Sequence, residues 1–143
     1  MNPITAAVKQ VFDIDGWNTE IAPGDDIIYS KYICDKGEWI FYARTSIDAV
    51  AFYSLYPARV PVEKRDEIIK LLTMLNDGLI LGNFELNFEN DEIRFKTSMD
   101  LKHVEINDKI CRSLLYNNLD QMEKNIEAIN ALISSDFHKS DIN

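Results

Sequence analysis

The sequence has very few of the residues that build disulfide frameworks, metal centres and nucleophilic active sites. Its 143 residues include two cysteines, Cys34 and Cys111, and two histidines, His103 and His138. Disulfide frameworks and zinc sites need more cysteines, or two cysteines at close C-x-x-C spacing. We therefore expect both cysteines to be reduced, buried thiols that pack as small apolar groups, and we expect no metal and no cofactor.

No catalytic set can be assembled from the sequence. The histidines and cysteines are spread along the chain, so neither a Cys/His pair nor a Ser/His/Asp set is apparent. A metal site at His103 needs at least one more ligand, and His138 falls in a polar tail where we expect it to be solvated. Acidic pairs such as Asp25-Asp26 lie in predicted turns, and the segment around Asp91 does not match a calcium-binding EF-hand loop. The sequence therefore predicts no catalytic residues and no enzyme.

Long apolar runs and an excess of positive charge are also missing. No apolar run approaches ~20 residues, the length that spans a membrane, and the N-terminus lacks the regions of a signal peptide. Fifteen basic residues against 24 acidic residues give a net charge of −9. This charge disfavours binding to nucleic-acid phosphates and to anionic membranes, and it suits solubility or a basic partner. We expect a cytoplasmic protein that binds neither nucleic acid nor membranes.

The composition that remains predicts one folded domain over residues 1–143. Apolar residues make up 46% of the chain and aromatic residues 10%, and no repeat or low-complexity segment interrupts them. The patterns predict a helix over 1–15, three strands over 27–56, a helix over 61–81, a hairpin over 84–100, a last helix over 107–135 and a frayed tail over 136–143.

The segment 61–101 has the clearest pattern in the chain. Pro61 suits the first position of a helix, and the apolar residues that follow recur at helical spacing. Gly82 can adopt the left-handed conformation that ends such a helix. Gly78 lies inside the predicted helix, where it indicates either the close approach of another backbone or a helix that frays at that point.

Alternating apolar residues after Gly82 predict a β-hairpin. Pairing Phe88 with Ile93 across a connection at 89–92 also places Leu86 opposite Phe95, so apolar residues meet on one face. This agreement is the reason to predict that register.

The same segment carries a family resemblance. The residues that carry it are Arg65, Leu75, Asn76, Leu79, Gly82, Asn83, Phe84, Glu85, Leu86, Ile93, Arg94, Phe95 and Leu101. This run resembles the YbjN family of bacterial sensory-transduction regulators. The resemblance implies an α+β fold like that of type III secretion chaperones, with a helix, three strands, a helix, two strands and a long last helix over about residues 3–133. It carries over no site residues, because the family has no established active-site motif.

The strands predicted over 27–34, 38–45 and 48–56 bear apolar or aromatic residues on both faces. A sheet with one solvated face would show a clear alternation of apolar and polar residues. Either three helices divide between the two faces of a five-stranded antiparallel sheet, or a second subunit or a bound segment covers what the helices leave open. The last helix, about 40 Å long, lies along the sheet or extends to a partner.

Three classes of function remain open. The first is a non-enzymatic chaperone-like or adaptor protein that forms a homodimer and binds a protein or peptide segment in bacterial signalling or stress regulation. The second is a small-ligand sensory domain with an apolar pocket between sheet and helices. An enzyme ranks third, because it needs a cleft with perturbed titratable groups. For the first class we predict that Lys31, Tyr42 and Arg44, on the outward face of their strands, contact the partner.

Overall fold

The structure, a computed structural model, describes residues 1–135 and builds one mixed α and β fold from them. The predicted tail at 136–143, with His138, lies outside the described residues. The elements are α1 (Pro3–Ile14), β1 (Glu20–Ile21), β2 (Ile27–Cys34), β3 (Gly37–Thr45), β4 (Ala49–Arg59), the 3-10 turn η1 (Val62–Lys64), α2 (Arg65–Asp77), β5 (Asn83–Asn87), β6 (Glu92–Asp100) and α3 (Asp108–Ser134). The strands form one antiparallel sheet in the order β1-β2-β3-β4-β6-β5.

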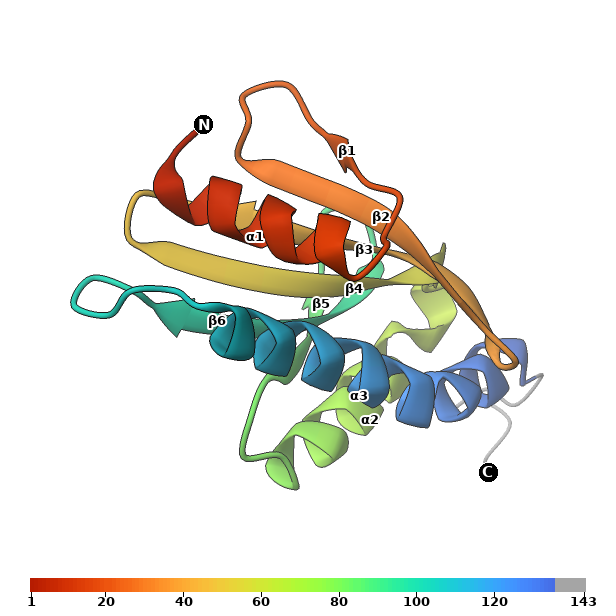
Figure 1. The fold of residues 1–143 in the computed structure, drawn as a ribbon. Coiled ribbons are helices and arrows are strands. Elements are labelled where there is room, and N and C mark those ends of the chain that lie inside the picture. Colours follow the sequence, from red (N-terminus) through yellow and green to blue (C-terminus); the bar gives the residue numbers. More distant parts are fainter. Residues whose placement is uncertain (136–143) are drawn as a thin grey trace, which may run out of the picture.

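All three helices pack against the same face of this sheet. Figure 1 is seen from the helix side, with α1 and α3 in front of the strands. One core cluster joins Phe12 of α1 and Leu115 of α3 to Phe52 of β4. A second joins Ile68 of α2 and Met122 of α3 to Phe95 of β6. The strand residues of both clusters share one face by register, so the alternative in which the helices divide between two faces is wrong.

The first and last helices begin where the sequence predicts. The Asn2 side chain accepts a hydrogen bond from the Thr5 backbone N–H at 2.9 Å, and the Asn107 side chain accepts one from Ile110 at 2.9 Å. α3 packs along β4 and β6 and contributes to both core clusters, as expected for a helix that lies along the sheet. No helix within residues 1–135 is both long and apolar enough to cross a membrane.

The second helix is shorter than predicted. It begins at Arg65 instead of 61, because Pro61 precedes the 3-10 turn η1 and not the first turn of α2. It ends at Asp77 instead of 81, with Gly78 in an ordinary right-handed conformation. The Asn76 side chain both accepts from the Phe84 backbone N–H at 2.7 Å and donates to its carbonyl at 3.0 Å, which pairs the helix end with β5. Gly82, at φ +76°, lies against β6, where an added Cβ would be 2.6 Å from the Phe95 ring. The helix therefore ends just before Gly78, and the close backbone approach belongs to Gly82.

The sheet has six strands, one more than the sequence predicts. The additional strand, β1, pairs Ile21 with Ile28 and Glu20 with Tyr29. Two residues are too few to show an alternating pattern, so the segment reads as part of a loop. The third predicted strand also continues past 56, because β4 reaches Arg59 through an irregularity in its pairing with β6.

The hairpin register differs from the predicted one by two residues. The structure pairs Leu86 with Ile93, and the connection runs over 88–91. Asn87 fixes this turn, since its side chain accepts from the Glu89 N–H and its carbonyl accepts from the Asp91 N–H at 2.8 Å. Asp91 adopts a positive φ of 57°, which aspartate tolerates. A shift of two residues keeps the paired side chains of both strands on their predicted faces, whereas Phe88 falls in the connection and is 67% exposed. The apolar pattern alone therefore does not exclude the wrong register.

Candidate functional site: the open face of the sheet

The face of the sheet opposite the helices is not covered by any element within residues 1–135. We call it the open face. Its central residues, each placed by strand register, are Ile27, Tyr29 and Lys31 of β2, Ile40, Tyr42 and Arg44 of β3, Ala51, Tyr53 and Leu55 of β4, and Arg94 and Lys96 of β6. Apolar, aromatic and cationic side chains thus alternate across four strands.

The structure places the three predicted contact residues on this face. Tyr42 lies in its centre, opposite Tyr29 on one neighbouring strand and Tyr53 on the other. Lys31 lies 3.6 Å from Glu38 near the β2–β3 turn, and Arg44 lies at the other end of β3. Their common orientation is as predicted, but they are distributed along the face and do not converge on one point.

The aromatic and cationic centre of the open face was not predicted from the sequence. The rings of Tyr42 and Tyr53 stack with centroids 4.8 Å apart. The Arg94 guanidinium lies 5.2 Å and the Lys96 ammonium 5.8 Å from the Tyr53 centroid, and Arg94 also bonds Glu85 at 3.0 Å. Alternation along 92–100 places both cations on the polar side of the hairpin, but the sequence does not show that β6 lies beside β4.

Burial raises the pKa of the Tyr42 phenol, and the positive charge of Arg94 only partly opposes this rise. Tyr42 is therefore a neutral hydrogen-bonding group near pH 7, not a base. This state suits a contact residue, because the ring offers apolar area and the hydroxyl offers a polar partner.

Three hollows run across the open face. One of about 430 Å³ is lined by Lys31, Ile40 and Leu55 among others. A second of about 400 Å³ is lined by Ile40, Tyr42 and Arg44, so it borders the first at Ile40. A third of about 410 Å³ shares Arg44 with the second. Together they form a continuous uneven surface that a chain segment can follow.

Charges on the open face are largely balanced, although the chain carries −9 overall. Glu38 lies beside Lys31, and Glu85 lies beside both Arg94 and Lys96. Arg44 forms no ion pair with any residue that the structure describes. Within residues 1–135, the open face therefore carries paired charges together with one cation, Arg44, that has no counter-ion.

A smaller aromatic hollow lies at the helix side of the sheet edge. It measures about 290 Å³ and is lined by Trp17, Tyr32, Tyr116, Glu123 and neighbouring residues. Tyr32 donates a hydrogen bond to Glu123 at 3.0 Å, and burial together with this bond raises the pKa of Tyr32 to about 12.

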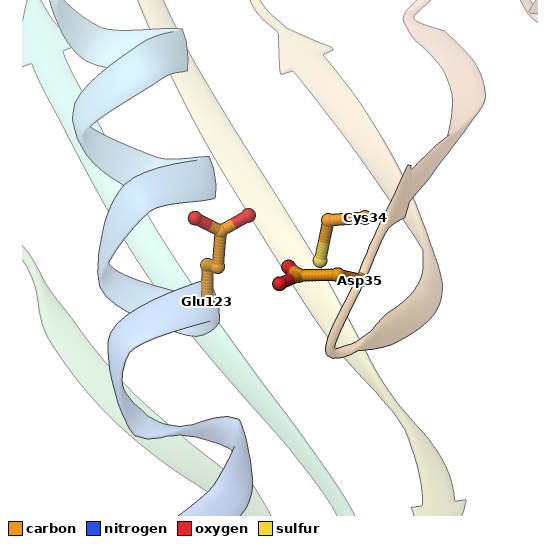
Figure 2. Close-up of side chains that lie close together, drawn as sticks. All are labelled: Cys34, Asp35 and Glu123. Atoms are coloured by element: carbon orange, nitrogen blue, oxygen red, sulfur yellow. The ribbon is translucent and has the colours of Figure 1, made fainter.

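One group of side chains in the described part of the chain has the donor atoms and spacing of a metal site. Figure 2 shows Cys34 and Asp35, at the β2–β3 turn, beside Glu123 of α3. The Cys34 sulfur and one oxygen of each carboxylate lie within 4.8 Å of one another. The expectation of two buried cysteines holds for Cys111 but not for Cys34, which is partly exposed. His103 is exposed in the loop that follows β6.

Comparisons with known proteins agree with this architecture, an α+β fold whose helices lie on one face of an antiparallel sheet. The sequence model of the YbjN family, described as "Putative bacterial sensory transduction regulator", matches residues 5–131. The chain therefore belongs to the YbjN family, as the resemblance of segment 61–101 indicated.

A solved structure shows the same fold. It is titled "Crystal structure of YbjN, a putative transcription regulator from E. coli", and it superposes with a TM-score of 0.53 at 10% sequence identity. The match covers 82% of this chain and 92% of that one. No curated protein matches the chain.

Proposed function

We propose that this chain is a non-enzymatic regulatory protein that binds a segment of another protein on its open face, in bacterial signalling or stress regulation. The observation that carries the proposal is the sheet face itself, which bears aromatic and aliphatic side chains and lies opposite all three helices. Contiguous exposed apolar surface of this kind is typical of sites where proteins meet. The family description as a regulator supports a binding role.

The side chains of the open face indicate what kind of segment fits. Tyrosine and arginine are the residues that most often dominate the energy of protein interfaces, and Tyr42 and Arg44 lie side by side along one hollow. Arg44 lacks a counter-ion within residues 1–135, so an acidic side chain beside an apolar one would complement it. Lys31 offers a second cation at the other end of the face, and its only ion-pair partner within residues 1–135 is an exposed glutamate.

A peptide selection tests this proposal. A displayed library of random peptides is selected on the full chain, and the recovered peptides are titrated against the wild type and the triple variant Lys31→Ser, Tyr42→Ser, Arg44→Ser. We expect acidic, partly apolar peptides whose affinity falls at least tenfold in the triple variant, because the anchors are removed. The control is Lys102→Ser, Lys109→Ser, which changes two exposed lysines outside the open face and should leave affinity unchanged.

Two results would contradict the proposal. In one, the selection enriches no peptide; in the other, the recovered peptides bind the triple variant, still folded, as tightly as the wild type. Circular dichroism of each variant distinguishes a lost contact from a lost fold.

The same proposal includes a homodimer. Exposed apolar side chains gather on α2 and the loop after it, where Met74 is 69%, Ile80 98% and Leu81 63% exposed. Such side chains favour burial against a second copy. We expect light scattering over a dilution series to give a dimer mass for the wild type and a monomer mass for Ile80→Ser, Leu81→Ser. A wild-type monomer at all concentrations would exclude the dimer.

A cytoplasmic location belongs to this proposal as well. Cys34 and Cys111 are both free thiols, as is usual in a reducing compartment. Fractionation of cells that express the chain should recover it with cytoplasmic marker proteins, and recovery with envelope proteins would contradict this location.

The aromatic hollow favours a second candidate function, a small-ligand sensor. Trp17, Tyr32 and Tyr116 give it apolar walls, and Glu123 gives it a polar group. A ligand bound there would change the fluorescence of Trp17. A screen of metabolites tests this candidate by measuring the fluorescence of Trp17 in Trp39→Phe, which lacks the other tryptophan. The candidate predicts at least one metabolite that changes this fluorescence and no longer does so when Tyr116→Ala is added. If the screen finds no such metabolite, the result counts against the candidate.

A further inference from the structure

Cys34, Asp35 and Glu123 come from segments far apart in the sequence and meet at one point. Cys34 is the last residue of β2, Asp35 begins the turn to β3, and Glu123 lies near the middle of α3. Figure 2 shows their side chains directed toward one another between the turn and the helix. Their donor atoms, one sulfur and two carboxylate oxygens, lie within 4.8 Å of one another.

We propose that Cys34, Asp35 and Glu123 bind a divalent transition-metal ion, for which Zn²⁺ is the best fit. Zinc accepts both thiolate and carboxylate ligands, whereas Mg²⁺ and Ca²⁺ prefer oxygen ligands alone. With zinc–ligand bonds of about 2.0–2.3 Å, ligand atoms in a tetrahedral site lie about 3.5 Å apart. The side chain of Asp35 is exposed and can rotate to close the remaining difference. Three protein ligands leave the fourth position of the ion for water.

The charges around the cluster support this assignment independently of its geometry. Within residues 1–135, neither Asp35 nor Glu123 forms an ion pair. Nearby carboxylates do have cations, since Asp120 lies 3.0 Å from Lys124 and Asp15 lies 2.8 Å from Arg112. Two carboxylates thus converge on a thiol with no ion pair to a cation in the described part of the chain, and a divalent ion would supply positive charge there.

Groups around the ligands already orient them. Tyr32 donates a hydrogen bond to one Glu123 oxygen at 3.0 Å, which leaves the other oxygen for the ion. The backbone N–H groups of Lys36 and Gly37 donate hydrogen bonds to the Cys34 sulfur. Outer contacts of this kind commonly fix metal ligands in place.

Metal binding at this site replaces one proton. A metal-free cysteine thiol carries a proton, and only the thiolate is a metal ligand. The ion binds the thiolate, and the proton leaves to solvent. No electron is transferred, and the bound ion ties the β2–β3 turn to α3.

The site is tested by titrating the full, tag-free chain with Cd²⁺ and with Zn²⁺. Cd²⁺ should give an ultraviolet thiolate-to-metal absorption band that saturates at one equivalent, and Zn²⁺ should displace it. We expect Cys34→Ser to abolish the band and Glu123→Gln to weaken binding at least tenfold. Glu127→Gln, one helical turn further along α3, is the matched control and should bind like the wild type.

The proposal is overturned if no saturable band forms, or if Cys34→Ser binds both metals as the wild type does. It is also overturned if Glu123→Gln and Glu127→Gln weaken binding equally, since this would mean loose attraction to an acidic surface. Thermal unfolding gives a second readout: Zn²⁺ should raise the Tm of the wild type and of Glu127→Gln, but not that of Cys34→Ser. A Tm that is the same with and without Zn²⁺ in the wild type contradicts the site.

Discussion

Tyr42 of β3 and Tyr53 of β4 stack on the open face with their ring centroids 4.8 Å apart and their planes at 21°. Tyr53 is only 6% exposed, although no helix within residues 1–135 lies on that side. Arg94 and Lys96 cover its ring instead. The open face thus has a rigid aromatic centre beneath two long, movable cations, an arrangement that can present an anchor to a partner without rearranging the sheet.

We predict that Asn118 is the polar side chain whose loss destabilises the fold most. It lies in α3, 1% exposed, where it accepts a hydrogen bond from Ser54 at 2.6 Å and donates to the carbonyls of Phe52 and Phe95. Asn118→Leu leaves these groups without partners in the core, so urea unfolding should show a loss of about 3 kcal/mol. The half-buried neighbour Asn117, changed to Ala, should lose about 0.5 kcal/mol or less, and equal losses would contradict this role.

Asn118 also illustrates what the sequence could not predict. The apolar residues of α3, such as Leu115 and Met122, recur at a spacing that predicted the helix and its buried stripe correctly. Asn118 follows Leu115 by three residues and precedes Met122 by four, so helical spacing places it on the same face, but no local pattern shows which polar groups it meets there. Its burial depends on polar groups of β4 and β6, which are brought to α3 only by the tertiary fold.

The open face could be predicted only in part from the sequence, because local patterns show which residues of a strand share a face but not which strands are neighbours. Alternation along a strand determines which side chains share a face, so Lys31, Tyr42 and Arg44 were placed together correctly. The two-sided apolar strands left open whether the helices divide between both faces or leave one face uncovered, and only the structure decides for the second alternative. Alternation does not determine which strands lie next to each other in the sheet, since this depends on how the strands pair. The position of the β6 cations over Tyr53 was therefore not predicted. The meeting of Cys34 with Glu123 was beyond sequence analysis, because no local pattern joins β2 to α3.

Gly82 should tolerate no side chain. An alanine Cβ there would lie 2.6 Å from the Phe95 ring and 2.9 Å from the Lys96 carbonyl, and its φ of +76° is itself unfavourable. We expect Gly82→Ala to cost about 3 kcal/mol or more of unfolding free energy. Gly16→Ala is a matched control, because Gly16 also has a positive φ but its Cβ meets nothing within 4 Å; this change should cost about 1 kcal/mol. Equal costs would show that the contact with β6 has no effect.

The pair of Asp15 and Arg112 should make stability depend on pH in acid. Arg112 donates to both Asp15 oxygens, and hydrogen bonds from Arg112 and Tyr116 lower the pKa of Asp15 below its usual value. The pKa of Asp15 is lower in the folded protein than in the unfolded chain, so ionised Asp15 stabilises the fold above pH ~4. This stabilisation is lost as the pH falls through the pKa of Asp15 in the folded protein. The wild type should therefore exceed Asp15→Asn in stability by about 1 kcal/mol at pH 7, after allowance for solvent screening.

This difference should vanish at low pH, where Asp15 is protonated in both states. Urea unfolding of both proteins between pH 7 and pH 2 measures it. Glu105→Gln, at an exposed carboxylate outside this pair, should follow the wild type throughout. A difference that stays constant down to pH 2 would contradict an ionic origin.

The most direct test of the account is a photo-crosslinking comparison of two tyrosine positions. Tyr42 on the open face and Tyr116 on α3 are each replaced by a photoreactive phenylalanine in the full chain. Each variant is then irradiated together with a peptide recovered from the peptide selection described above. The account predicts a chain–peptide adduct from position 42 and none from position 116. Three results would contradict it. The adduct could form from position 116 alone, the two positions could give equal yields, or position 42 could give only a product with twice the mass of the chain.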